Sequence, residues 1–201
     1  MTDQPDYEGA IQYALYLLRT KLPADLSYHS YEHTAEDILP AVERLARLCQ
    51  VEPDELEMLR VGAAYHDLGY INNHLDHEQA GARIAAQVLP GYGFDPEKVD
   101  QITSMIMATR LPQAPTNRLE EILVDADLDS LGRDDFFMRS QQLQQELAAY
   151  GRPLTKRQWH QEQLDFLRSH TYFTEAARNL RQTAKLEHIA QIESWLEQGE
   201  D

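Results

Sequence analysis

The segment VGAAYHDLGY, residues 61–70, is an apolar run that ends in an adjacent histidine and aspartate, His66 and Asp67. Burying an imidazole beside a carboxylate at the end of a hydrophobic helix is costly unless both groups are compensated. A divalent cation would compensate them, because neutral imidazole and carboxylate are both good metal ligands. A structural hydrogen bond between the two side chains would do the same, so the pair alone leaves both interpretations open.

Two flanking segments supply more side chains of the same kinds. His33 lies near the start of an amphipathic helix, in YHSYEHTAED (28–37). Three aspartates lie close together near the end of a later helix, in LVDADLDSLG (123–132), and Asp127 is the middle one. Carboxylates in such apolar surroundings repel one another unless a cation or hydrogen bonds intervene. A histidine, a His-Asp pair and a late aspartate from three helices would form an octahedral metal site with water in the open positions.

The rest of the chain is patterned as helix. Leucine and alanine supply 47 residues, and valine and isoleucine only 15, which favours helix over sheet. Apolar residues recur at helical spacing, as in residues 11–18, and helix starts are indicated by Asp95-Pro96 and by Thr155 with Gln158. No segment alternates for long enough to indicate a strand. We expect an all-α bundle of eight or nine helices, near residues 6–21, 31–49, 53–68, 76–89, 96–109, 117–130, 134–149, 156–169 and 174–198.

We expect the whole chain to form one domain, with a motif-bearing core at about 28–132 and a helical extension at about 155–201. The extension is more polar and only weakly periodic. It could be a helical cap on the core, a hairpin that forms a homodimer, or a partly frayed tail. Arg178, Arg181 and Lys185 form a basic stripe within it, for which we expect a solvated face.

Composition excludes several classes of function. The net charge of −16, from 18 basic and 34 acidic residues, disfavours binding to a nucleic-acid polymer, so a phosphate substrate must be attracted by a local cation. The single cysteine, Cys49, excludes an internal disulfide and a cysteine-based zinc site, and fits a reducing compartment. No apolar run approaches the roughly 20 residues of a membrane span, and the acidic N-terminus is not a signal peptide. We therefore expect a soluble, cytoplasmic protein that does not bind membranes.

The order of these residues resembles a known pattern. His33, then His66-Asp67, then Asp127 is similar to the H…HD…D pattern of the HD-domain superfamily of metal-dependent phosphohydrolases, and the resemblance covers about residues 28–132. It implies an all-α HD fold in which these four residues bind one divalent ion, whether manganese, nickel, magnesium, iron or zinc. It also implies hydrolysis of a phosphomonoester or phosphodiester of a small molecule, frequently a nucleotide.

The implied chemistry suits these residue types. A bound divalent ion lowers the pKa of its water ligand and offsets phosphate charge. Asp67 is placed to bind the metal and to orient the attacking water, which makes it a candidate catalytic residue. The alternative is a non-catalytic domain that senses a nucleotide or a metal.

His77, in NNHLDHEQAGARIA, is at the position where binuclear members of this superfamily carry a further histidine ligand. The next histidine that those proteins need should fall near Met105–Arg110, where this chain has none, so a complete second metal site is doubtful. His77 could ligate a weak second ion, donate a hydrogen bond or proton to phosphate, or cap the following helix. Glu78 is a general-base candidate or a solvated carboxylate, and we expect His29 to be a surface histidine.

Two arginines are candidate phosphate ligands, because a guanidinium binds phosphate bidentately. Arg110 occupies the place of the missing histidine, and Arg133 follows the aspartate-rich segment. Either could instead be a surface arginine at a helix C-terminus, which the helix dipole favours. Asp125 and Asp129 are four residues apart and share a helix face, so we expect them to brace the ligand helix rather than to bind metal.

Overall fold

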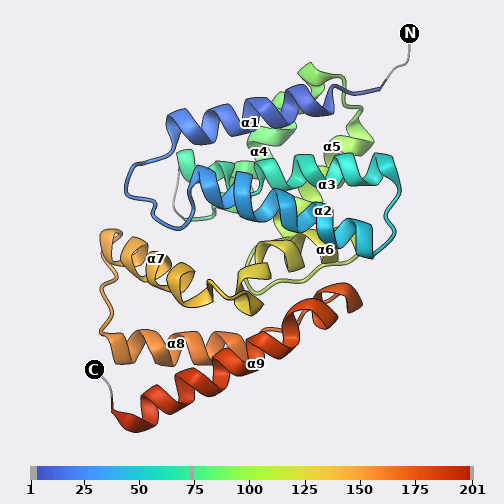
Figure 1. Ribbon diagram of the computed structural model, residues 1–201. Helices are drawn as coiled ribbons and strands as arrows, with labels where there is room; N and C mark the ends of the chain where they lie inside the picture. Colours follow the sequence, from blue (N-terminus) through green and yellow to red (C-terminus); the bar gives the residue numbers. More distant parts are fainter. Residues whose placement is uncertain (1–3, 73–74, 200–201) are drawn as a thin grey trace. The chain divides into compact units, whose positions relative to one another are not determined.

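The computed structural model describes residues 4–72 and 75–199, and within these ranges it contains helices and no strand (Figure 1). The all-α fold and the predicted number of helices are confirmed. The α-helices are α1 (Tyr7–Lys21), α2 (Leu39–Leu48), α3 (Pro53–Tyr65), α4 (His77–Val88), α5 (Pro96–Ala108), α6 (Arg118–Asp127), α7 (Phe136–Ala149), α8 (Lys156–Ser169) and α9 (Glu175–Gln198). No helix in the described ranges is both long and apolar enough to cross a membrane.

The described chain divides into two compact units. The first contains the residues up to Pro23 together with His29–Asp127, and the second contains Ala24–Tyr28 together with the residues from Leu128 onward. The short segment joins the second unit through specific hydrogen bonds. The backbone N–H of Tyr28 donates to the buried carboxylate of Glu146 at 2.8 Å. That the whole chain forms one domain stays a prediction.

Helix α3 is the central element of the first unit and packs against α1, α2, α5 and α6. Its first turn is fixed by Pro53 at the first helical position and by a capping box between Glu52 and Glu55. Its second half carries small and apolar residues on every face, and residues 61 to 65 are buried. A helix that is apolar all round belongs in a core. The helix ends inside the unit, where His66 and Asp67 follow it.

The predicted helix 31–49 begins differently from an ordinary α-helix. Residues His33–Ile38 form a π-helical turn, η1, which continues directly into α2. Single π turns within helices are frequent at functional sites. His33 is the first residue of this turn and is buried, with 2 % of its surface exposed.

The second unit contains α7, α8 and α9, and α8 packs against α9. The predicted cap of α8 is present, because Thr155 accepts a hydrogen bond from the N–H of Gln158 and the Gln158 side chain bonds back to Thr155. Thr174 caps α9 in the same way, by accepting from the N–H of Ala177. Tyr172, just before α9, is fully buried, so it packs inside this unit.

The expectation of a solvated basic stripe on α9 is wrong for two of its three residues. Arg181 donates two hydrogen bonds to the carboxylate of Asp129, at 2.7 and 2.9 Å. Lys185 is 2 % exposed, and its ammonium donates to the backbone oxygen of His170 at 2.6 Å. Burial lowers the pKa of Lys185. Burial, with the Lys185 charge, lowers the pKa of His170 to about 4. Arg181 and Lys185 therefore pack inside the second unit, whereas Arg178 is exposed.

Candidate metal centre

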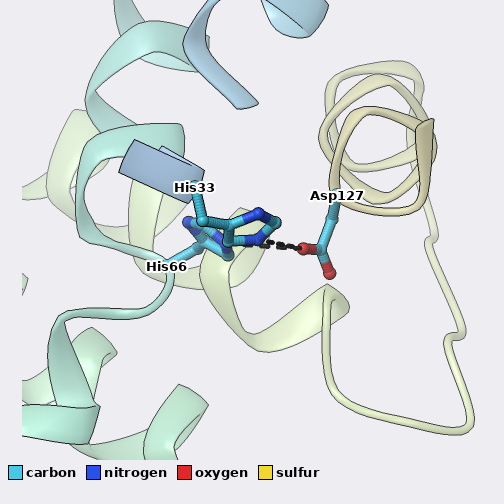
Figure 2. Close-up of side chains that lie close together, drawn as sticks. All are labelled: His33, His66 and Asp127. Carbon is cyan, nitrogen blue, oxygen red and sulfur yellow. Dashed lines mark ion pairs between the residues drawn. The ribbon is translucent and has the colours of Figure 1, made fainter. Parts of the chain in front are cut away.

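Three of the four predicted metal ligands converge in the first unit (Figure 2). His33 begins η1, His66 follows the last residue of α3, and Asp127 is the last residue of α6. One nitrogen from each histidine and one Asp127 oxygen all lie within 4.8 Å of one another. The Nε2 atoms of His66 and His33 lie 3.4 and 3.9 Å from Oδ1 of Asp127.

The fourth predicted ligand, Asp67, lies beside this cluster. Its Oδ2 atom is 3.2 Å from Nε2 of His66 and 3.7 Å from Nε2 of His33. Its other oxygen, Oδ1, lies 3.7 Å from Nε2 of His77. The Asp67 carboxylate therefore presents one oxygen to the two histidines of the cluster and the other to the predicted catalytic histidine.

The orientation of His66 is set by the backbone of its own helix. Its Nδ1 lies 2.7 Å from the carbonyl oxygen of Ala63, which can only accept a hydrogen bond, so Nδ1 carries the proton. In the neutral imidazole that binds a metal, the lone pair is then on Nε2, the atom that faces Asp67 and Asp127. Histidine ligands of metals are commonly oriented by such a contact from the second nitrogen. In His33 the second nitrogen, Nδ1, lies 3.8 Å from a carboxylate oxygen of Asp37.

A divalent ion fits these residues. His66 Nε2 and Asp67 Oδ2 are buried and form no hydrogen bond with any residue that the structure describes, although buried polar atoms normally find a partner. Two ligand atoms that are each about 2.1 Å from one ion lie roughly 3.0 Å apart in octahedral and roughly 3.4 Å apart in tetrahedral geometry. The separations of 3.2 and 3.4 Å at His66 are in this range, and those at His33 are slightly wider.

The electrostatics of the cluster also favour a cation. Burial alone would lower the pKa of His66, but the carboxylates of Asp67 and Asp127 outweigh it and raise that pKa well above its ordinary value. Burial would raise the pKa of Asp67, and the His66 imidazole reverses this and lowers it. The two neighbouring carboxylates therefore stabilise positive charge at this point, whether a proton or a metal ion supplies it.

His77 is brought to the site by a close approach between two segments. It begins α4, and a Cβ atom on Gly69 would lie 1.9 Å from the His77 backbone oxygen. Only glycine leaves room for this contact. The side chain of His77 contacts Asp67 and also lies 3.5 Å from Oε1 of Glu78. Burial lowers the pKa of His77, against the opposing effect of these two carboxylates.

Three residues lie beside the cluster, of which Tyr70 was not identified from the sequence and His29 and Glu78 differ from what was expected of them. The ring of Tyr70 stacks on His77 at 4.0 Å and on His29 at 4.3 Å, and its hydroxyl lies 3.2 Å from Nε2 of His29. His29 is therefore part of the surroundings of the site rather than an isolated surface histidine. Glu78 is 8 % exposed, so its interpretation as a solvated carboxylate is wrong. All three residues lie in or next to the segments that carry His33, His66 and His77, and this position in the sequence could have indicated them. The stacking of the rings could not be predicted, because it depends on three-dimensional packing.

The two predicted phosphate ligands lie in different units. Arg110 follows α5 in the first unit and is half exposed, and it donates to Asp76, the residue before His77, at 2.6 Å. Arg133 belongs to the second unit, where it forms two hydrogen bonds with Asp135, at 2.8 and 2.6 Å. Arg110 is thus connected to the start of α4, and a substrate role for either arginine stays a prediction.

The neighbouring aspartates also differ. Asp125 is fully buried in α6, and Asp129 is held by Arg181 in the second unit. Neither is part of the three-residue cluster. That the two aspartates brace the ligand helix stays a prediction.

A comparison with protein-family models finds no match, and a comparison with curated proteins finds none either. The chain is similar in structure to a predicted HD superfamily hydrolase from an uncultured Thermotogales bacterium, with a TM-score of 0.65 and 19 % sequence identity over 96 % of this chain and 93 % of that one. It is also similar to a protein from Lactobacillus plantarum, with a TM-score of 0.66 and 16 % identity over 93 % of this chain and 96 % of the other.

A third similar structure is that of YpgQ from Bacillus subtilis in complex with ADP, with a TM-score of 0.64 and 16 % identity over 94 % of this chain and 95 % of that one. Likeness at such identities concerns the fold. The HD-domain fold expected from His33, His66-Asp67 and Asp127 is therefore confirmed.

Proposed function

We propose that this chain is a metal-dependent phosphohydrolase that cleaves a phosphoester of a small molecule. The observation that carries the proposal is the cluster of the buried His33 and His66 with Asp127, and with Asp67 beside them. Four ligand groups of the right chemistry, with two buried atoms lacking hydrogen-bond partners in the described chain, suit one divalent ion. When bound, such an ion lowers the pKa of a coordinated water and offsets phosphate charge.

The surrounding residues have distinct parts in this proposal. Asp67 offers Oδ2 to the cluster and keeps Oδ1 toward His77, so it can hold a nucleophilic water by a hydrogen bond while it also binds the ion. His77, whose side chain is 20 % exposed, can donate a hydrogen bond to a phosphate oxygen or to the leaving group. Arg110, half exposed and attached to the start of α4, is the guanidinium that we propose for a second phosphate contact.

For the substrate we propose a nucleotide. The structure of YpgQ, which this chain resembles in fold, is a complex with ADP. The charge of −16 disfavours a long polyanion, whereas a small phosphate compound can be attracted by a local cation. A membrane surface, which is commonly anionic, is disfavoured for the same reason.

The test is turnover by the metal-loaded protein. Purified protein is stripped of metal, reloaded separately with manganese, nickel, magnesium, iron and zinc, and incubated with a panel of nucleotides and generic phosphate esters. We expect phosphate or nucleoside release with at least one ion, and loss of this activity in Asp67→Asn. Asp100→Asn, the same change at an exposed position of α5, is the matched control and should retain it.

Two outcomes would contradict the proposal. Equal turnover in Asp67→Asn and in the unchanged protein would assign the activity to a contaminant or to another site. Saturable binding of an intact nucleotide, with no product under any metal, would favour the alternative of a sensing domain.

A further inference from the structure

The second unit contains a pocket that has no part in the metal chemistry. It lies among α7, α8 and α9 and has a volume of about 420 Å³, which is within the range of small-molecule sites. None of its lining residues belongs to the metal centre. Aromatic rings, glutamine side chains and a lysine line it.

Three rings from three helices form the aromatic part of this pocket. The ring of Trp195 in α9 lies 4.9 Å from that of Phe137 in α7 and 5.0 Å from that of His160 in α8, the latter nearly parallel at 26°. Trp195 is partly exposed, so part of its indole surface is accessible to a ligand. Aromatic ligands stack favourably on such rings.

The two tryptophans that line the pocket differ in hydrogen bonding. Trp159 is buried, and its indole N–H donates to Oγ of Ser140 at 2.9 Å, which links α8 to α7. The indole N–H of Trp195 has no hydrogen-bond acceptor in the described part of the chain. A donor is therefore available at the pocket for an acidic or carbonyl group.

The charge of the pocket is opposite to that of the whole chain. Lys156 is the charged residue among those that line it, and it is exposed at the first position of α8. Lys156 forms no ion pair with any described residue, although acidic residues outnumber basic ones almost two to one. The N-terminal end of α8 adds the positive end of the helix dipole at this point.

We propose that this pocket binds a small molecule in which an aromatic ring carries an acidic group, such as an aromatic carboxylate. The ring packs against Trp195, and the acidic group lies toward Lys156 and the start of α8. The selectivity follows from the two features together. An aromatic cation would be repelled by Lys156, and an acid without a ring would not use the indole surface.

The probe is 2-naphthoate, followed by two-dimensional nitrogen–proton NMR of the full chain. Because the chain contains two tryptophans, it gives two indole N–H signals, which Trp195→Phe assigns. We expect a saturable shift that is larger for Trp195 than for Trp159. 2-Naphthamide, which has the same ring without the charge, should bind at least about fivefold more weakly, and cyclohexanecarboxylate should not shift the signals.

Charge reversal tests the role of the lysine. Lys156→Glu should weaken 2-naphthoate binding about tenfold and should make 2-naphthylmethylamine the preferred ligand. The matched control is Lys21→Glu, the same reversal at an exposed position at the end of α1, which should change neither affinity.

Three results would overturn the proposal. One is equal binding of naphthoate and naphthamide, and another is unchanged naphthoate affinity in Lys156→Glu. The third is a shift of the Trp195 signal with protein concentration alone, since that would indicate that a second copy of the chain occupies the pocket.

Discussion

The ion pair between Arg181 and Asp129 should make a large contribution to the stability of the second unit. The guanidinium and the carboxylate are joined by two hydrogen bonds, and their side chains are only 18 % and 3 % exposed. Arg181→Leu removes the cation and leaves the carboxylate in a buried position. Removing one partner costs about 3–5 kcal/mol for a fully buried pair, so about 2–3 kcal/mol is expected for this partly buried one.

The assay uses the position of the two tryptophans, Trp159 and Trp195, both of which lie in the second unit. Intrinsic fluorescence during urea unfolding therefore reports on that unit. With a typical dependence of about 2 kcal/mol per molar urea, the expected loss lowers the midpoint by about 1–1.5 M. Circular dichroism at the same urea concentrations follows the helices of both units.

A second ion pair in the same unit provides the control. Arg168 of α8 and Glu193 of α9 lie 2.6 Å apart, but their side chains are 54 % and 38 % exposed. Exposed pairs contribute about 0–1 kcal/mol, so Arg168→Leu should barely move the midpoint. If the two variants shift it equally, the reasoning from burial is wrong.

Three further predictions concern the metal, a glycine and pH. Manganese at a hundred times its dissociation constant should stabilise the protein by about 2.7 kcal/mol in thermal unfolding. Asp127→Ala should abolish this stabilisation. If the stabilisation persists in the variant, the ion binds elsewhere. Gly69→Ala should destabilise by at least about 1–3 kcal/mol, because its Cβ would lie 1.9 Å from a backbone oxygen, whereas Gly91→Ala, with no atom within 4 Å, should be tolerated in the same denaturation assay. The pKa of His170 is lowered to about 4, so between about pH 4 and 6.5 the unfolded chain binds more protons than the folded one. The free energy of unfolding, measured by fluorescence, should therefore decrease as the pH drops through this window. His170→Asn should lack the part of this decrease that His170 causes.

Much of the fold could be predicted from the sequence because its signals are local. Apolar spacing and caps depend on residues three or four positions apart, and the structure places the helices within a few residues of the predicted ranges. The cluster of candidate metal ligands could be predicted because each of its residues lies in a distinctive segment. The convergence of His33, His66 and Asp127 was an expectation of the HD pattern, and the structure brings them together.

The surroundings of the site and the packing of α9 could not be predicted, because both depend on contacts between distant residues. Glu78 follows His77 at a helix start, where a carboxylate is commonly solvated, and only the packing of α4 buries it. Arg181 and Lys185 have the spacing of an exposed basic face. Their partners, Asp129 and the His170 carbonyl, come from segments 52 and 15 residues away. From residue type alone, arginine and lysine are expected to be exposed to solvent.

The hydrogen bond from Tyr28 to Glu146 has a consequence for biosynthesis. The two residues are 118 positions apart, and Ser27 makes a similar bond to the backbone of Gln142 across 115 positions. On a ribosome, Ala24–Tyr28 emerges long before its acceptors exist. The segment therefore lacks these native partners until more than a hundred further residues have been made. Completion of the second unit is thus a late event, and chains released before Glu146 is translated would keep this short segment open to proteases.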